Sequence, residues 1–340
     1  MKRLAERLVW AVLVLWAVIT LTFVINNVLP GDPARMVAGP AARPADIERI
    51  RQQLGLDRPL LAQYARFMSR LVHTPRAAAD DVPDKEHASC AAWGQLHIDL
   101  GKSYQQRRPV TTILAEKLPR TAMLAMAALL VQLVLGVLMG ILAAMKRGTR
   151  ADLGIVGVSL LGVSMPTFML GIGLQYVFAH RLKWLPLDGF GKTPRENLLS
   201  LVLPALTLGI FGAAYYTRLV RDEMIGLLQQ DYIRTALAKG ASRYRAVLVH
   251  ALRNALVPIV TVVALDLGAL VGGAVVTETL FRWPGIGALS VNALLDRDGP
   301  VILGTVLLTS TAIVLSNVVA DFLYVLLDPR IRASSGDTPR

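Results

Sequence analysis

Long apolar runs separated by short polar segments are the dominant pattern along the chain. Six windows of about 20 residues or more each hold at most one charged side chain: roughly 9–29, 121–145, 154–179, 199–219, 256–277 and 301–327. A helix needs about 20 apolar residues to cross the ~30 Å hydrocarbon core of a bilayer. A helix also satisfies its own backbone hydrogen bonds there. The pattern therefore predicts an all-α polytopic membrane protein with six transmembrane helices.

The composition supports a membrane protein rather than a soluble one. Hydrophobic residues make up 54% of the 340 residues, although the chain also carries 36 lysines and arginines. A soluble protein with this composition would expose too much apolar surface to stay dispersed. Apolar core helices of a soluble protein are the alternative, and six of them at membrane-spanning length argue against it.

The net charge of +12 is distributed unevenly over the predicted connections. Basic residues gather in the N-terminus, in the connection after residue 145, in the region 218–253 and in the C-terminal tail. Short loops rich in Lys and Arg remain in the cytoplasm. We therefore expect both termini to be cytoplasmic and no binding of nucleic acid. The first apolar run reaches Leu29 without a small-x-small cleavage site, which favours an uncleaved first span over a signal peptide.

These spans and charges divide the chain into four parts. We expect an N-terminal segment with the first span, a long extracytoplasmic loop, a five-span core and a cytoplasmic tail: residues 1–30, 31–119, 120–330 and 331–340. The core contains a charged cytoplasmic hairpin at 220–255. Small residues at helical spacing, Gly136 and Gly140, predict close helix packing in the second span.

The long loop contains two short amphipathic helices and an insertion. Residues 45–71 have the periodicity of such helices, with a break near Gly55. A polar stretch near 74–93 is rich in aspartate and proline and is typical of an inserted segment. Cys90 is the chain's single cysteine, so it can form neither an intramolecular disulfide nor a cysteine metal cluster. We therefore expect Cys90 to be incidental and predict no metal site.

The motifs of common enzymes are missing from the sequence. Gly101-Lys102-Ser103 resembles the end of a phosphate-binding loop, but the required first glycine is replaced by Leu96. No HExxH metalloprotease motif or GxSxG nucleophile elbow occurs, and the five histidines are scattered. We therefore expect no catalytic site and no hydrolysis of ATP by this chain.

Ionisable and helix-breaking residues inside the spans are candidates for a translocation path, because charge is costly in hydrocarbon. Asp266 lies about ten residues into the fifth span. It either lines a polar path or pairs with a polar group on a neighbouring helix. Met165 and Pro166 interrupt the third span, where a proline kinks a helix. Glu278 lies where the fifth span ends, and it either joins the path or is interfacial.

The hairpin from Asp231 to Pro258 is too long and too charged for a plain turn. Asp231 is placed to cap a short helix, and Gly240 separates it from a second amphipathic segment. On a helical wheel of residues 243–256, one face holds Tyr244, Val247, Leu248, Ala251, Leu252 and Ala255. The opposite face holds Arg243, His250, Arg253 and Asn254. The physical pattern fits equally an element lying on anionic lipid and a helix presented to a cytoplasmic partner.

The hairpin sequence resembles the coupling loop of ATP-binding-cassette importer permeases, whose general pattern is EAA-x3-G-x9-I-x-L-P. Of the EAA triplet only Ala236 matches, ahead of Gly240. His250 and Arg253 replace the isoleucine and the proline, which is typical of the dipeptide/oligopeptide/nickel branch. That branch has loops similar to DYIRTARAKG followed by HALRNALIP, and Leu237 stands here in place of its arginine.

Six further motifs occur in the order of that branch. They are LPGDP at 29–33, DLGKSY at 99–104, MKRG at 145–148, SMPTF at 164–168, TETLFRWPGIG at 277–287 and DPRIR at 328–332. The chain departs from the branch in the insertion near 74–93, and Asp266 stands where glutamine is common.

The resemblance implies a type I importer permease fold in the bacterial inner membrane. It implies a permease that is not an enzyme, binds no cofactor and pairs with a second homologous permease. Two cytosolic ATPase subunits would bind ATP and Mg, and an extracytoplasmic solute-binding protein would deliver the cargo. The ATPase-coupling residues that it implies are Asp231, Tyr232, Arg234, Thr235, Ala236, Lys239, Gly240, Ser242, His250 and Arg253.

The cargo that the resemblance implies is a di- or oligopeptide. Nickel chelate, glutathione or another small solute are alternatives within the same machinery. An ion-coupled secondary transporter is the alternative from a different class, with Asp266 as its ion-binding group. A structural scaffold would move no cargo at all.

Overall fold

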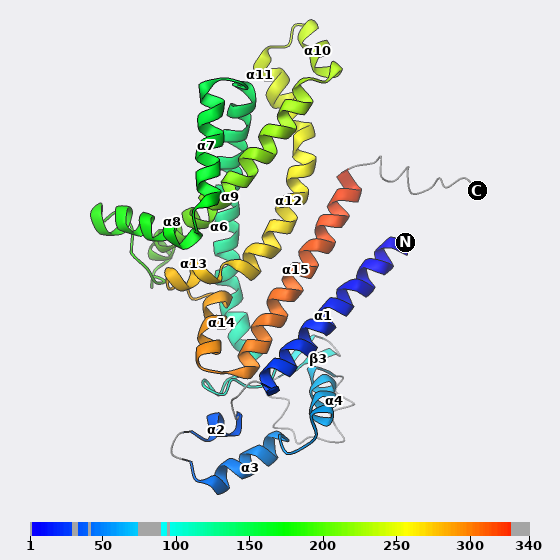
Figure 1. Cartoon of the computed structure of the whole chain (residues 1–340), viewed down its shortest axis with the longest axis vertical. Coiled ribbons are helices and arrows are strands. Elements are labelled where there is room, and N and C mark those ends of the chain that lie inside the picture. Colours follow the sequence, from blue (N-terminus) through cyan, green and yellow to red (C-terminus); the bar gives the residue numbers. More distant parts are fainter. Residues whose placement is uncertain (1, 29–32, 40–41, 74–89, 94–95, 328–340) are drawn as a thin grey trace, which may run out of the picture. The chain divides into compact units, whose positions relative to one another are not determined.

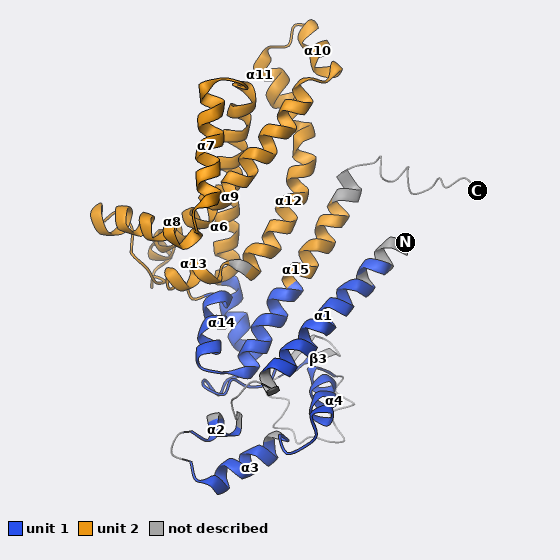
Figure 2. Ribbon diagram, in the orientation of Figure 1, with its two compact units in different colours: residues 1–119, 285–311 blue, residues 120–284, 312–340 orange. Residues whose placement is uncertain are grey.

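The computed structural model describes residues 2–28, 33–39, 42–73, 90–93 and 96–327. Most of these residues are helical, which confirms the predicted all-α class (Figure 1). The chain forms two compact units, which are described separately below (Figure 2). The first unit is residues 1–119 with 285–311, and the second is residues 120–284 with 312–340. The motif LPGDP except for Pro33, the motif DPRIR, the C-terminal tail and most of the 74–93 insertion lie outside the described residues.

Helices α6 (Val110–Met145), α9 (Pro194–Leu228) and α15 (Gly299–Leu327) are long and apolar enough to cross a membrane. A fourth candidate span, Arg243–Gly272, consists of α11 (Arg243–Arg245), η3 (Ala246–Ala251) and α12 (Leu252–Gly273). The pair Arg150–Ser164 and Thr167–Arg181 makes a fifth if its two halves count as one span. Helix α1 (Lys2–Val28) carries a shorter apolar stretch, Val9–Ile25. Several membrane spans are therefore confirmed, while the count of six stays a prediction.

The first unit also contains the short helices predicted in the long loop. They are α2 (Pro33–Ala38), α3 (Pro44–Leu54) and α4 (Leu60–Leu71). Gly55, with a φ of 70°, ends α3 at the predicted break, since glycine adopts this left-handed conformation without strain. The ring of Phe23 in α1 lies 5.3 Å from the rings of both Tyr64 and Phe67 in α4.

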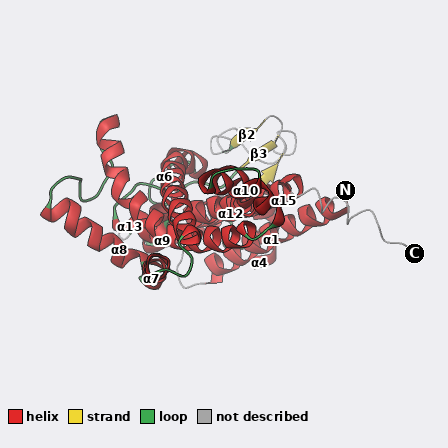
Figure 3. Ribbon diagram, turned by 90° about the horizontal axis from the view of Figure 1, so that it is seen from above, coloured by secondary structure: helices red, strands yellow, loops and turns green. Residues whose placement is uncertain are grey.

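A small antiparallel sheet in the first unit was not predicted (Figure 3). Its strands β1 (Val72–His73), β2 (Ala91–Trp93) and β3 (Leu96–Ile98) are ordered β1-β3-β2. Strands of two or three residues are too short to show the alternation that identifies a strand in a sequence. The sheet therefore adds a small β element to the described residues, most of which are helical.

The DLGKSY motif is held by one buried carboxylate, that of Asp298, between α14 (Ile286–Leu295) and α15. Ser103 Oγ donates to Asp298 Oδ2 at 2.5 Å, and the backbone N–H groups of Tyr104 and Gln105 donate to the same carboxylate at 3.1 and 3.3 Å. Burial, with a contribution from the nearby Asp298 charge, raises the pKa of Tyr104 to about 12. Ser103 of this motif thus holds the loop against Asp298.

The second unit is organised around α9, which packs against α7 (Arg150–Ser164), α8 (Thr167–Leu174) and α12. Gly136 and Gly140 allow α6 to approach α9 closely, as predicted. A Cβ atom at these positions would lie 2.4 Å from Tyr216 Cβ and 2.6 Å from Val220 Cβ, respectively. The bidentate ion pair of Arg221 with Asp152, at 2.7 and 2.9 Å, joins α9 to the start of α7.

Replacing Asp298 by alanine should destabilise the first unit, because it leaves one buried hydroxyl and two backbone N–H groups without their charged acceptor. We expect a loss on the order of 3 kcal/mol in the free energy of unfolding. The measurement is thermal unfolding of the detergent-purified chain, with Asp296→Ala as the control because Asp296 is exposed. Equal melting temperatures for the two variants would contradict the assigned role of Asp298.

Candidate functional site

The hairpin between α9 and α12 is built from a short helix, a glycine turn and a returning helix (Figure 1). The short helix is α10 (Asp231–Ala238), and the return runs through α11 and η3 into α12. The observed α10 and the turn at Gly240 confirm the predicted helix and its break.

The start of α10 differs from the prediction. Gln230 is the N-cap residue and makes no side-chain capping bond, while Asp231 is the first residue of the helix and is exposed. The prediction that Asp231 caps the helix was therefore wrong by one position. Its charge still lies in the first turn, where it complements the positive end of the helix dipole. Thr235 Oγ1 donates to the Asp231 carbonyl at 2.9 Å.

The end of α10 is a Schellman motif centred on Gly240, which has a φ of 89°. The Gly240 N–H donates to the Leu237 carbonyl at 2.9 Å, and the Ala241 N–H donates to the Ala236 carbonyl at 3.1 Å. No atom lies within 4 Å of where a Cβ at Gly240 would be, so only the backbone conformation requires glycine here. Ser242 then caps the next helical turn by accepting from the Arg245 N–H at 3.3 Å.

A single buried residue docks α10 onto the rest of the unit. The side chain of Ile233 is 1% exposed and belongs to the same apolar cluster as Met224 of α9 and Val247 of η3. This cluster continues into α12 through Ala255 and Ile259. The short helix is therefore packed against both helices that flank the hairpin.

The apolar face of the helical wheel is divided in the structure. Val247, Ala251 and Ala255 are buried, whereas Tyr244 and Leu248 are 70% and 52% exposed. Ala246, which the wheel did not place on this face, is also buried. It begins η3, a π-helix with more residues in each turn than the α-helix assumed by the wheel.

The outer surface of α10 is free of intrachain packing over much of its length. Tyr232 and Leu237 are 39% and 43% exposed, and Arg234 is exposed beside Asp231, with their charged atoms 3.6 Å apart. The Tyr232 hydroxyl accepts from Asn254 Nδ2 at 3.0 Å, which adds a polar link from α10 to α12.

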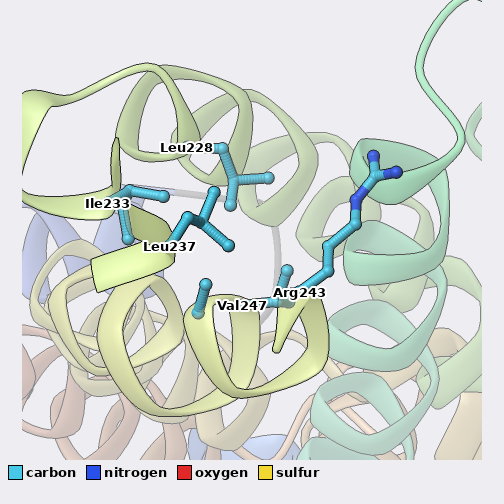
Figure 4. Close-up of a pocket in the computed structure, with 6 residues that line it drawn as sticks. Leu228, Ile233, Leu237, Arg243 and Val247 are labelled. Carbon is cyan, nitrogen blue, oxygen red and sulfur yellow. The ribbon is translucent and has the colours of Figure 1, made fainter. Parts of the chain in front are cut away.

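An apolar groove of about 340 Å³ lies between the end of α9, α10 and η3 (Figure 4). Its lining residues are Leu228, Ile233, Leu237, Arg243, Ala246 and Val247. The Arg243 side chain extends away from the apolar residues, and its Nη2 donates to the Met145 carbonyl at the end of α6 at 3.4 Å. The groove can take apolar side chains of a partner, with a fixed cation at its border.

The structure brings the predicted coupling residues onto this one hairpin. Asp231, Tyr232, Arg234, Thr235 and Ala236 lie on α10, and Lys239 and Gly240 form its end. His250 in η3 is half-buried, and Arg253 at the start of α12 is exposed.

Most of the residues that support the hairpin were not singled out from the sequence, although Val247 was placed on its apolar face. Ile233, Leu237, Ala246 and Val247 form its apolar packing and its groove. The four-residue spacing of Ile233 and Leu237 was the available signal, because it places both on one side of a short helix.

The candidate translocation residues lie in different environments. Asp266 in α12 accepts a hydrogen bond from the Tyr216 hydroxyl of α9 at 3.1 Å. This contact agrees with the alternative to a polar path, in which Asp266 pairs with a polar group on a neighbouring helix. Met165 and Pro166 separate α7 and α8, and the two helical segments are bent by 103° there.

Glu278 lies in α13 (Val275–Leu280), and its side chain is fully buried within the chain. Thr121 Oγ1 of α6 donates to Glu278 Oε1 at 2.7 Å. Trp283 of the same TETLFRWPGIG motif is also fully buried, and its Nε1 donates to the Arg120 carbonyl at 3.0 Å. The motif thus anchors the segment after α12 to the α6 helix.

The family of binding-protein-dependent transport system inner membrane components matches residues 136–333. Its N-terminal counterpart matches residues 1–125. The chain therefore belongs to this family of importer permeases.

Several relatives are similar over almost the whole chain. A putative peptide transport system permease protein of Brucella abortus (strain 2308) is 40% identical over 335 residues, covering 98% of both chains. A probable D,D-dipeptide transport system permease protein of Escherichia coli (strain K12) is 38% identical, again with 98% of both chains covered. A glutathione transport system permease protein of Escherichia coli O6:H1 is 38% identical, covering 96% of this chain and 97% of the relative.

A solved structure of the MetNI methionine ABC transporter in an inward-facing conformation shares the fold. The TM-score is 0.51 at 17% sequence identity, and the match covers 65% of this chain and 98% of the other. The chain accordingly has the type I importer permease fold that the resemblance implied.

Replacing Ile233 by alanine should loosen α10, because a large side chain is lost from a buried position. The expected local cost is about 2–5 kcal/mol. Trypsin digestion of the folded chain should then cleave faster at Arg234 and Lys239, since cleavage requires local opening of the helix. The matched control is Leu237→Ala on the same helix, whose partly exposed side chain should leave cleavage nearly unchanged. Equal cleavage rates for the two variants would contradict the docking role of Ile233.

Proposed function

We propose that this chain is a permease subunit of an ATP-driven importer, with α10 as the helix that couples it to an ATPase. The observation that carries the proposal is the hairpin itself. A short helix is held rigidly at its base by Ile233, while Tyr232, Arg234 and Leu237 remain exposed for a partner. A helix lying on lipid would have no need of the rigid Gly240 turn or of a groove beside it.

The proposed partners are a second homologous permease, two cytosolic ATPase subunits and an extracytoplasmic solute-binding protein. The ATPases would bind ATP and Mg, and the serine of the GKS residues in this chain is instead hydrogen-bonded to Asp298. This assignment places the hairpin and both termini in the cytoplasm and residues 31–119 outside, as the basic residues of the short loops predict. Membership of the importer permease family supports the proposed assembly.

The packing of α10 suggests how a movement of the ATPases reaches the spans. Ile233 joins α10 to the apolar cluster shared by α9 and α12, and Tyr232 adds the hydrogen bond to Asn254. A displacement of α10 therefore moves the ends of two spans together rather than bending a loose loop. ATP-driven closure would select the outward-facing state of the permeases through its different contacts with α10 in the two states.

The proposed cargo is a di- or oligopeptide. The relatives are named for peptides, D,D-dipeptides and glutathione, all of which are amino acids joined by amide bonds. Glutathione is therefore the second candidate, and nickel chelate remains an alternative within the same machinery. Asp266, Met165, Pro166 and Glu278 stay proposals for the path.

Replacing Gly240 by valine should uncouple transport. A β-branched residue at a φ of 89° is strained by on the order of 1–3 kcal/mol, so the end of α10 would change shape. We expect ATP-driven uptake to be lost while membrane insertion is normal. The matched control is Gly226→Val in α9, where the φ is not positive and no atom lies within 4 Å of the added Cβ. Normal uptake by Gly240→Val would contradict the coupling role.

Uptake of a radiolabelled dipeptide into proteoliposomes should require the ATPase subunits and ATP. Asp266→Asn should retain most of this uptake, because an amide can still accept the hydrogen bond from Tyr216. Collapse of the proton gradient should have no effect. Transport by the permeases alone, driven by an ion gradient and abolished by Asp266→Asn, would instead establish a secondary transporter.

A further inference from the structure

Three side chains with metal-binding chemistry meet on the small sheet of the first unit. One ligand atom from each of His73, Cys90 and His97 lies within 4.8 Å of the other two. Cys90 Sγ is 3.6 Å from His73 Nε2, and the two imidazole rings are 5.6 Å apart. All three residues are half-buried.

The strand register explains why these residues share one face. His73 of β1 lies directly opposite His97 of β3, and His97 in turn lies opposite Ala92 of β2. Directly opposed residues point to the same face of a sheet, and side chains alternate between the faces along a strand. Cys90 precedes Ala92 by two residues, so it belongs to the same face as the two histidines.

The spacing of the ligand atoms fits a single bound ion. Zn²⁺ binds cysteine sulfur at about 2.3 Å and histidine nitrogen at about 2.0 Å. With tetrahedral angles, these bond lengths place the two atoms about 3.5 Å apart. The observed 3.6 Å between Cys90 Sγ and His73 Nε2 agrees with this value.

A hydrogen bond orients His73 for this role. Its Nδ1 lies 2.9 Å from the Arg70 carbonyl oxygen. Because a carbonyl oxygen can only accept, Nδ1 carries the proton, and in the neutral ring Nε2 presents its lone pair toward Cys90. Metal-binding histidines are commonly oriented by such a bond from the other ring nitrogen to a backbone carbonyl.

We propose that His73, Cys90 and His97 form a binding site for a divalent transition-metal ion, with Zn²⁺ as the best match. Three protein ligands leave a fourth position for water or for a donor from another molecule. The ligands at positions 73 and 90 flank residues 74–89, so the ion would join the two ends of that segment. This site is independent of the proposed transport function.

Metal binding would change the protonation of Cys90, because the thiolate is the form that binds a metal ion. Burial, followed by the nearby Asp99 charge, raises the pKa of the free Cys90 thiol. On binding, the metal–sulfur bond replaces the S–H bond and the thiol proton passes to solvent, so metal affinity should rise with pH.

The single cysteine makes a direct test possible in the full-length, detergent-purified chain. Labelling of Cys90 by a maleimide is followed with and without added Zn²⁺, in the presence of a non-chelating phosphine reductant. We expect Zn²⁺ to slow labelling, a chelator to restore it, and Co²⁺ to give a thiolate charge-transfer band that Zn²⁺ displaces. Unchanged labelling in the wild-type chain would overturn the proposal without any variant being needed.

Histidine variants distinguish Zn²⁺ binding by all three side chains from Zn²⁺ binding by the Cys90 thiol alone. His73→Ala and His97→Ala should each lower the apparent Zn²⁺ affinity by about 10-fold or more. Mutation of a residue that only hydrogen-bonds to a metal ligand already lowers metal affinity by roughly 10–100-fold. His180→Ala is the matched control, because His180 is exposed and lies outside the cluster. If both cluster variants kept wild-type protection by Zn²⁺, the histidines would not be ligands and the proposal would fail.

Discussion

Hydrocarbon offers no hydrogen-bond partner to a peptide group, and this constraint determines most of the structure. Every segment that crosses the membrane must satisfy its own backbone, so the apolar runs are helices. The hydrophobic effect contributes little between helices in lipid, and close packing takes its place. Gly136 and Gly140 serve this packing by letting α6 approach α9. Two carboxyl groups of the second unit have a hydroxyl partner on another helix, Asp266 with Tyr216 and Glu278 with Thr121.

The part of the hairpin that contains α10 lies outside the candidate membrane spans. Here an eight-residue helix, too short to be stable in water by itself, is held by tertiary packing of Ile233. Its ends are defined by local backbone chemistry, with Gly240 in the left-handed conformation and Ser242 as the next cap. The result is a short helix that is packed at its base and exposed on its outer surface. This arrangement, rather than any catalytic group, is what the proposed transport function requires of the chain.

Much of the fold and of the hairpin could be predicted because the relevant signals are local. Apolar run length predicts the spans, and a glycine between two amphipathic segments predicts the turn. Two details of the hairpin were not predicted. The residue pattern did not indicate the π-helix η3, in which Ala246 is buried although the α-helical wheel left it off the apolar face. The N-cap position that was predicted for Asp231 is occupied by Gln230. Helix boundaries are commonly misplaced by one or two residues when they are assigned from sequence.

The sequence by itself determined the helical class, several membrane spans, the short helix α10 and the family, because each depends on neighbouring residues or on motifs in order. Only the tertiary structure decided which distant residues meet. It paired Ser103 with Asp298 and Tyr216 with Asp266, and it placed His73, Cys90 and His97 on one face of a sheet. Cys90 seemed incidental in the sequence because its neighbours there are not its neighbours in space. Strand pairing depends on register between separate segments, and very short strands leave no periodic signal from which to infer that register.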